Sequence, residues 1–241
     1  MTLKGSSAIV LLAALATAAG TARLGVWQLD RAGQKIALQE ALRSRRAMPP
    51  LPADELARDA AQAAAQQHRG ITLLGRWQPE FTVYLDNRQM DDRPGFFVLT
   101  PLRLDDGSAV LVQRGWVPRD AADRTHISAP APPAGRVAVQ GRIALAPGRL
   151  YEFSGAASGA IRQNLDIEAY ARETALPLLP LSVVQEDAVA VPPDGLLRHW
   201  PVPAAGVQKH YGYAFQWFAL SALCIGLYVW FQLIRPRRQH R

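Results

Sequence analysis

The stretch YGYAFQWFALSALCIGLYVWFQLI, residues 211–234, decides the fold class, because no charged side chain interrupts it. An α-helix rises about 1.5 Å per residue, so this helix would be about 36 Å long and would exceed a membrane hydrocarbon core of about 30 Å. Aromatic residues gather near its two ends, as they do at lipid headgroups: Tyr211, Tyr213, Trp217, Tyr228, Trp230 and Phe231. Length and lack of charge favour a transmembrane helix over the core helix of a soluble domain.

A second apolar segment lies near the N-terminus. Residues 5–22 are uncharged and rich in alanine, Arg23 interrupts the segment, and residues 24–29 extend it. It is either an uncleaved membrane anchor or a signal peptide, in which Lys4 supplies the basic end and the small residues of 16–22 supply the cleavage site. The residues alone leave both interpretations open.

The distribution of charge indicates a membrane protein rather than a nucleic-acid-binding one. The net charge is +7, but residues 31–209 hold 21 of the 27 basic and 19 of the 20 acidic residues, so the excess lies beside the apolar termini. The tail RPRRQHR follows the second apolar stretch at residues 235–241. Because positively charged loops stay in the cytoplasm, both termini are predicted to be cytoplasmic. Residues 31–209 would then be exported to the periplasm or its mitochondrial equivalent.

Cysteine usage fits this topology. Cys224 is the single cysteine of the chain and lies within the second apolar stretch, which excludes intramolecular disulfides and CxxC metal sites. An exported region without cysteine suits an oxidising compartment.

The region between the two apolar segments predicts an α+β domain whose sheet is mainly antiparallel or forms a partly closed barrel. Turn residues separate short apolar runs, and Asp105-Asp106-Gly107 predicts a hairpin. Helices are predicted at 34–46, at 54–67 with Asp54 as a cap, and at 166–175 with Asp166 as a cap. Strands are predicted at 70–77, 81–87, 95–104, 108–117, 136–145 and 179–186.

Common catalytic motifs are absent from the sequence: it contains no GxSxG, GxxxxGK or HExxH. Ser154 and Ser158 flank glycine and alanine with the wrong spacing for a nucleophile elbow, which indicates a loop. Several carboxylates cluster near turns and indicate solvated loop tips rather than an acid–base pair: Asp86, Asp91, Asp92, Asp105 and Asp106. We therefore expect a protein that is not an enzyme.

One histidine, His210, differs from the other four because it stands where the second apolar stretch begins, on the predicted outer side. On a helix it shares a face with Ala214, Trp217, Ser221 and Cys224. An ionisable group at a membrane edge is a candidate functional residue, and neutral imidazole binds iron or copper. The alternative is an interfacial histidine that only anchors the helix together with Lys209.

Short motifs along almost the whole chain resemble those of the surfeit locus protein one family, membrane-tethered assembly factors of cytochrome c oxidase. Residues 24–31 with Lys35 resemble the LGxWQxxR opening of the family, and residues 210–218 resemble its HxxYAxQWF start of the second span. Further blocks that fit the family are residues 69–77, 83–88, 94–102, 111–118 and 163–166. Their order between two apolar stretches makes the combination specific, whereas residues 40–68 match no motif of the family.

The resemblance favours an uncleaved anchor and implies a role in building the haem–copper oxidase of a respiratory chain. His210 matches the proposed haem a ligand of the family. Tyr213 and Trp217 would then be haem contacts, and three cations at a similar depth could meet the propionates or simply anchor the helices: Arg31, Lys35 and Lys209.

The expected partners are oxidase subunit one, haem A synthase and the lipid bilayer, with no nucleic acid, and the expected cofactor is transiently held haem a. The alternative is a scaffold of the bacterial inner membrane that stabilises an oxidase assembly intermediate without holding haem. A periplasmic enzyme is disfavoured by the absence of catalytic motifs.

These inferences divide the chain into five parts. The parts are a cytoplasmic N-terminus at 1–5, a first transmembrane helix at 6–29, a periplasmic α+β domain at 30–209, a second transmembrane helix at 210–234 and a basic cytoplasmic tail at 235–241. Within the domain, Gly115 stands between Arg114 and Trp116 in a predicted strand, which indicates a bulge or a close backbone approach.

The topology can be tested with reporter fusions. A phosphatase that is active only in the periplasm should work when fused after Pro118 and should be inactive when fused after Arg241, because only the first position is exported. Alkaline phosphatase activity in intact cells measures both. The reverse pattern, or release of a shortened soluble chain, would contradict the predicted topology.

Overall fold

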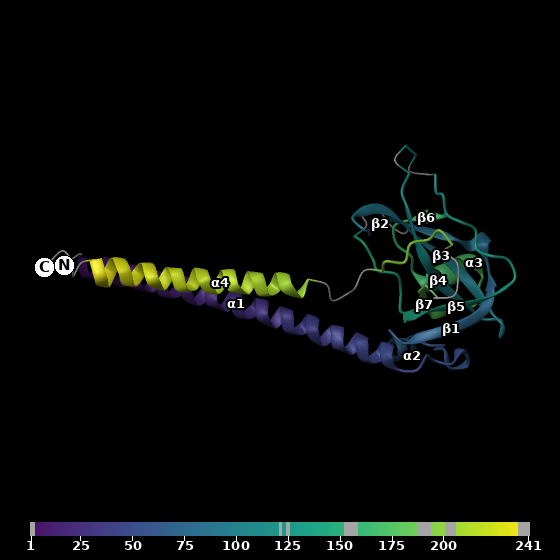
Figure 1. The fold of residues 1–241 in the computed structure, drawn as a ribbon, viewed down its shortest axis with the longest axis horizontal. Coiled ribbons are helices and arrows are strands. Elements are labelled where there is room, and N and C mark those ends of the chain that lie inside the picture. Colours follow the sequence, from purple (N-terminus) through teal and green to yellow (C-terminus); the bar gives the residue numbers. More distant parts are fainter. Residues whose placement is uncertain are drawn as a thin grey trace. The chain divides into compact units, whose positions relative to one another are not determined.

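A computed structural model of the chain describes residues 3–120, 122–123, 126–151, 159–187, 194–200 and 206–235. The chain divides into two units, which are taken separately below: a helical unit of residues 1–41 and 202–241, and a sheet unit of residues 42–201 (Figure 1). Ser154, Ser158 and the arginine-rich tail after Arg235 lie outside the described residues.

The helical unit contains two long helices. α1 spans Leu3–Ala47, and α4 spans Val207–Tyr228 and continues as a π-helical segment, η3, over Val229–Ile234. Both helices are long and apolar enough to cross a membrane, in agreement with the two predicted spans. Insertion, export of residues 30–209 and the cytoplasmic side of the termini stay predictions.

α1 joins two helices that the sequence analysis kept apart, the span at 6–29 and the helix at 34–46. No strong helix breaker separates them, because Gly33 alone costs only about 1 kcal/mol relative to alanine and the first proline of the chain is Pro49. Arg45 and Arg46 lie in the last turn of α1, where their positive charges interact favourably with the negative end of the helix dipole.

The sheet unit is built on seven strands within the described residues. They are β1 (Gly70–Trp77), β2 (Val83–Met90), β3 (Arg93–Leu104), β4 (Ala109–Pro118), β5 (Arg136–Ala144), β6 (Ile161–Arg162) and β7 (Leu178–Gln185). The two-residue strand β6 was not predicted, because two residues carry no periodic signal.

Five of these strands close a barrel. β1, β5, β7, β4 and β3 are neighbours in this order, and β1 pairs again with β3 (Figure 1). β2 pairs with β3, and β6 pairs with β2. The ladders β4–β7 and β2–β6 are parallel, and the others are antiparallel. The sequence predicted a mainly antiparallel sheet or a partly closed barrel, and the structure combines the two, because the mainly antiparallel sheet forms a barrel.

Local sequence explains the connections. The turn after β3 ends on Gly107, whose φ of 86° lies in the left-handed region that glycine adopts freely, as expected for the predicted hairpin. α3 (Ile167–Thr174) begins where predicted, because the Asp166 side chain accepts from the backbone N–H of Ala169.

The predicted helix at 54–67 is shorter than expected. Its first part is a 3₁₀ turn, η1 (Ala53–Glu55), and only α2 (Ala60–Gln66) is α-helical. The cap is Asp59, which accepts from the N–H of Gln62, rather than Asp54. A second 3₁₀ turn, η2 (Pro79–Phe81), follows β1.

Alternate residues of the strands fill the barrel. In β1, Ile71 and Leu73 are almost completely buried, whereas Thr72 and Leu74 are exposed. A second apolar cluster lies outside the barrel, where α3 packs Tyr170 against the sheet. Its other buried members are Val83, Leu85, Leu99, Leu111, Leu165 and Ile167.

Gly115, the glycine of the sequence Arg114-Gly115-Trp116 (the RGW motif), lies at a β-bulge. Val98 of β3 pairs with Gly115, while Leu99 pairs with Gln113, so Arg114 is the extra residue. Trp116 then pairs with Leu197 through two backbone hydrogen bonds of 2.8 and 3.0 Å. The segment 194–200 thereby runs directly over Gly115, which confirms the predicted close approach.

Gly115→Glu should destabilise the sheet unit by about 1–3 kcal/mol, as expected for overpacking of a filled site. A Cβ at this position would lie 2.6 Å from Leu196 Cβ and 3.0 Å from the Leu197 carbonyl oxygen. Thermal unfolding of the purified full-length protein measures the change. Gly148→Glu is the control, because no atom of the described structure lies near a Cβ there. Equal melting temperatures for both variants would contradict the prediction.

Candidate functional site

The two long helices pack through residues that follow heptad spacing, with alternate steps of four and three residues. The buried and half-buried positions of this seam on α1 are Ala14, Ala18, Thr21, Gly25, Gln28, Ala32 and Lys35. Those on α4 are His210, Ala214, Trp217, Ser221, Cys224 and Tyr228. The seam therefore contains every residue that the sequence analysis placed on one face with His210.

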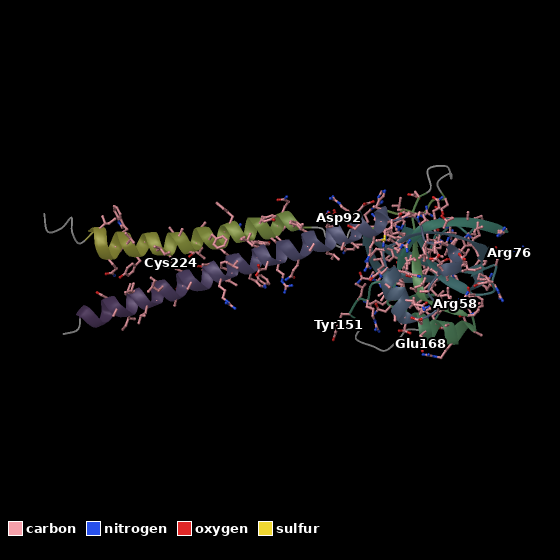
Figure 2. The ribbon with its side chains drawn as sticks, turned by 90° about the horizontal axis from the view of Figure 1, so that it is seen from below. Arg58, Arg76, Asp92, Tyr151, Glu168 and Cys224 are labelled. Atoms are coloured by element: carbon pink, nitrogen blue, oxygen red, sulfur yellow. The ribbon has the colours of Figure 1, made fainter. Side chains whose placement is uncertain are left out.

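Small side chains bring the two backbones close together. The Ser221 hydroxyl donates to the Ala18 carbonyl oxygen at 2.9 Å. The thiol of Cys224, which is labelled on α4 in Figure 2, lies 3.6 Å from the Ala14 carbonyl oxygen. A Cβ on Gly25 would lie 2.8 Å from the ring of Phe218. Small residues and interhelical hydrogen bonds of this kind hold helix pairs together where apolar surroundings offer no hydrophobic driving force.

His210 meets Gln28 across this seam. The two atoms in contact are His210 Nδ1 and Gln28 Oε1, 2.7 Å apart, although the residues are 182 positions apart in sequence. His210 lies in the first turn of α4, and its side chain is half-buried. The candidate ligand is thus held by a hydrogen bond to the other helix.

The other predicted site residues lie at different places around His210. Trp217 shares the seam with it, two helical turns or about 10 Å further along α4, while Tyr213 is 50% exposed. Arg31 is exposed and stacks on the ring of Trp27 at 5.5 Å. Lys35 and Lys209 differ, because Lys35 is half-buried on the seam and Lys209 is exposed. Trp217 and Lys35 therefore share the seam with His210, whereas Arg31 is exposed.

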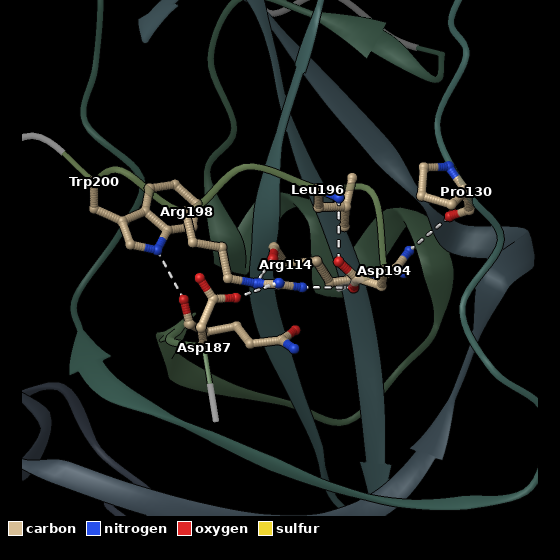
Figure 3. A network of polar contacts seen from close by, with 8 residues as sticks. Arg114, Pro130, Asp187, Asp194, Leu196, Arg198 and Trp200 are labelled. Atoms are coloured by element: carbon tan, nitrogen blue, oxygen red, sulfur yellow. Dashed lines mark hydrogen bonds and ion pairs between the residues drawn. The ribbon is translucent and has the colours of Figure 1, made fainter. Parts of the chain in front are cut away.

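A second polar site lies in the sheet unit at the RGW motif. Arg114 is only 2% exposed, and its guanidinium lies 5.3 Å from the ring centroid of Trp77. It donates to the Pro130 carbonyl oxygen at 3.4 Å (Figure 3). Burial lowers the pKa of Arg114, and the carboxylate of Asp194 opposes this shift.

Arg198 ties the segment 194–200 to the barrel beside Arg114. Its Nε donates to the Arg114 carbonyl oxygen at 2.6 Å, and its two other nitrogens pair with Asp187 at 2.7 Å and Asp194 at 2.5 Å (Figure 3). The Trp200 indole donates to the Gln185 carbonyl oxygen at 2.7 Å. Because each side-chain nitrogen of Arg198 has a partner, this network is suited to holding the segment in place.

Most of the carboxylates near turns have cationic partners. Asp86 pairs with Arg119, Asp105 with Arg136 and Asp106 with Arg58. Asp91 pairs with the His199 imidazole at 2.8 Å. Asp91, Asp105 and Asp106 lie in turns, as predicted, whereas Asp86 lies within β2 and is therefore not at a loop tip. Within the described residues, no group of three or more His, Cys, Asp or Glu side chains could hold a metal ion.

A scan against protein-family models matches residues 15–222 of the chain to the SURF1 family. The chain belongs to the SURF1 family. The match begins within α1 and ends within α4, and so it includes the barrel, His210 and the seam residues from Ala18 to Ser221.

Several known proteins are similar to this SURF1 family member over part of its length. A SURF1-like protein of Rickettsia bellii is 31% identical over 39% of this chain and 37% of its own. An uncharacterised SURF1-like protein of Mycobacterium tuberculosis is 30% identical over 48% and 41%. The cytochrome oxidase assembly protein SHY1 of Saccharomyces cerevisiae is 26% identical over 44% and 29%. The matched regions thus cover less than half of each relative.

Two features of these sites were not assigned from the sequence. Gln28 was noted only as part of the LGxWQxxR motif. Its spacing, three residues after Gly25 and four before Ala32, could have placed it on the same helix face as these two small residues. The pairing of Arg198 with Asp187 and Asp194 left no signal, because ion pairs at such loop positions follow no period.

An engineered disulfide can test the seam. Ala14→Cys should form an intramolecular disulfide with Cys224 under mild oxidation, because the native thiol already lies 3.6 Å from the Ala14 carbonyl oxygen. Loss of labelling by a maleimide–polyethylene glycol reagent, seen as a gel shift, measures the reaction. Ala16→Cys is the control, because Ala16 is exposed on another face of α1. Equal oxidation of both variants would contradict this packing.

Proposed function

We propose that this chain is an assembly factor for cytochrome c oxidase rather than an enzyme. Membership of the SURF1 family and the similarity to a yeast cytochrome oxidase assembly protein support this role. In this proposal it resides in a bacterial inner membrane with both termini in the cytoplasm. It binds haem a through His210 and helps to insert haem a into oxidase subunit one, with haem A synthase as a further partner.

The single observation that carries the haem proposal is the environment of His210. Its imidazole lies at the start of an apolar helix long enough to cross a membrane, and Nδ1 has a hydrogen-bond partner on the other helix. Iron-binding histidines commonly have such a partner, which orients the ring. Haem a is amphipathic, so a ligand at the boundary between apolar and polar surroundings suits both its tail and its propionates.

The set of donors fits haem better than a free metal ion. A porphyrin brings four nitrogens of its own, so one protein imidazole is sufficient to hold its iron. Cys224 is 14 residues further along the helix, about 21 Å away, and is too distant to bind the same iron. Tyr213 and Trp217, about one and two turns further along α4, offer aromatic surface on the helix that carries the imidazole. A singly held group is also easier to release to an acceptor.

The alternative function is a scaffold that stabilises an oxidase assembly intermediate and never holds haem. The buried Arg114 and the ion-paired Arg198 favour it, because they give the sheet unit a rigid surface around the RGW motif. In that case His210 would contribute only to the packing of α1 on α4.

Haem content of the purified full-length protein separates the two functions. After co-expression with haem A synthase, the wild type should contain haem a, and His210→Ala should lose most of it while staying in the membrane. His199→Ala is the control, because His199 is an exposed histidine of the sheet unit. Equal haem a content in the wild type and His210→Ala would reject the ligand role and favour the scaffold.

A further inference from the structure

We propose that Gln28 is a positioning residue for His210. It holds the imidazole in the tautomer that carries its proton on Nδ1, and so it reserves Nε2 as the nitrogen that binds iron. This inference rests on the proposed haem a binding at His210, and it names the residue that would prepare the ligand.

The chemistry of the two side chains determines the tautomer. Gln28 presents its carboxamide oxygen, Oε1, to His210 Nδ1 at 2.7 Å. In this orientation of the amide its oxygen can only accept a hydrogen bond, which assigns Nδ1 as the donor. In a neutral imidazole with Nδ1 protonated, the lone pair available to a metal is on Nε2.

The seam keeps Gln28 in position. Its neighbours one turn away on the same face are Gly25 and Ala32, and both are buried. The ring of Phe218 lies against Gly25, where a Cβ would come within 2.8 Å of it. The backbone of Gln28 is therefore held close to α4, so that its side chain starts within reach of the imidazole.

A positioned acceptor also changes the electronic character of the imidazole. A hydrogen bond from Nδ1 raises the electron density at Nε2, and partners of this kind typically contribute about 10–100-fold to metal affinity. A carboxylate at the same place accepts more strongly than a carboxamide and stabilises the more electron-rich ring. The oxidised, more highly charged iron gains most from such a ligand.

Three variants of the full-length protein separate positioning from packing. Gln28→Leu keeps the size of the side chain and removes the acceptor, whereas Gln28→Glu keeps an acceptor and adds charge. Gln34→Leu is the matched control, because Gln34 lies on the same helix and accepts from Arg31 at 3.0 Å instead of from α4.

The first measurement needs no haem. Long-range ¹H–¹⁵N correlation spectra of ¹⁵N-histidine-labelled protein in detergent micelles report the tautomer of each histidine, and the His210→Ala spectrum identifies the signals of His210. The Nδ1–H form should dominate in the wild type and in Gln34→Leu, and should lose its dominance in Gln28→Leu. An Nε2–H form in the wild type, or no change in Gln28→Leu, would overturn the proposal.

The second measurement uses protein co-expressed with haem A synthase. Gln28→Leu should bind haem a with about 10–100-fold lower affinity than the wild type. Gln28→Glu should keep most of the affinity and lower the reduction potential of the haem. Wild-type affinity in Gln28→Leu, or a raised potential in Gln28→Glu, would overturn the proposal.

The two measurements also separate this inference from the function on which it rests. A wild type that binds no haem a overturns the proposed function. The tautomer spectra would then decide the role of Gln28 independently: an Nδ1–H form that depends on Gln28 supports its hold on His210.

Discussion

The close approach of α1 and α4 is the constraint on which the candidate site depends. Two helices can meet through Ala18, Gly25 and Ser221 only because these side chains are small, so that the Ser221 hydroxyl reaches the Ala18 carbonyl oxygen and the Phe218 ring lies against Gly25. At this separation a glutamine on one helix reaches a histidine on the other. Larger residues on the seam would move the helices apart and would separate Gln28 from His210.

The sheet unit is a small barrel that buries a polar group, the guanidinium of Arg114. Closure between β1 and β3 removes the free edges of those two strands, and apolar side chains fill most of the interior. Arg114 is nonetheless buried against Trp77, and the segment 194–200 covers the bulge beside it. Leaving a buried charge without neighbours of opposite sign is costly, so Asp194 contributes to stability as well as to the shape of this end.

Arg114 and Trp116, which flank Gly115, both belong to the bulge that the segment 194–200 covers. The bulge changes the direction of the strand after Arg114, and the Trp116 indole then donates to the Arg88 carbonyl oxygen at 2.9 Å. Gly95 leaves the space for this ring, since a Cβ there would lie 2.4 Å from Trp116 Cζ2. The three residues of this motif therefore depend on one another through the backbone.

The amino-acid sequence by itself determined the two apolar helices, six of the strands, the turn at Gly107 and the Asp166 cap, because each depends on residues that are neighbours in the chain. It also singled out His210 through its place at the edge of a charge-free stretch. Only the tertiary structure decided that β1 returns to β3, that Arg198 covers Arg114, and that Gln28 faces His210. These contacts join residues that are far apart in sequence, and the hydrophobic period of one segment says nothing about which other segment will lie against it.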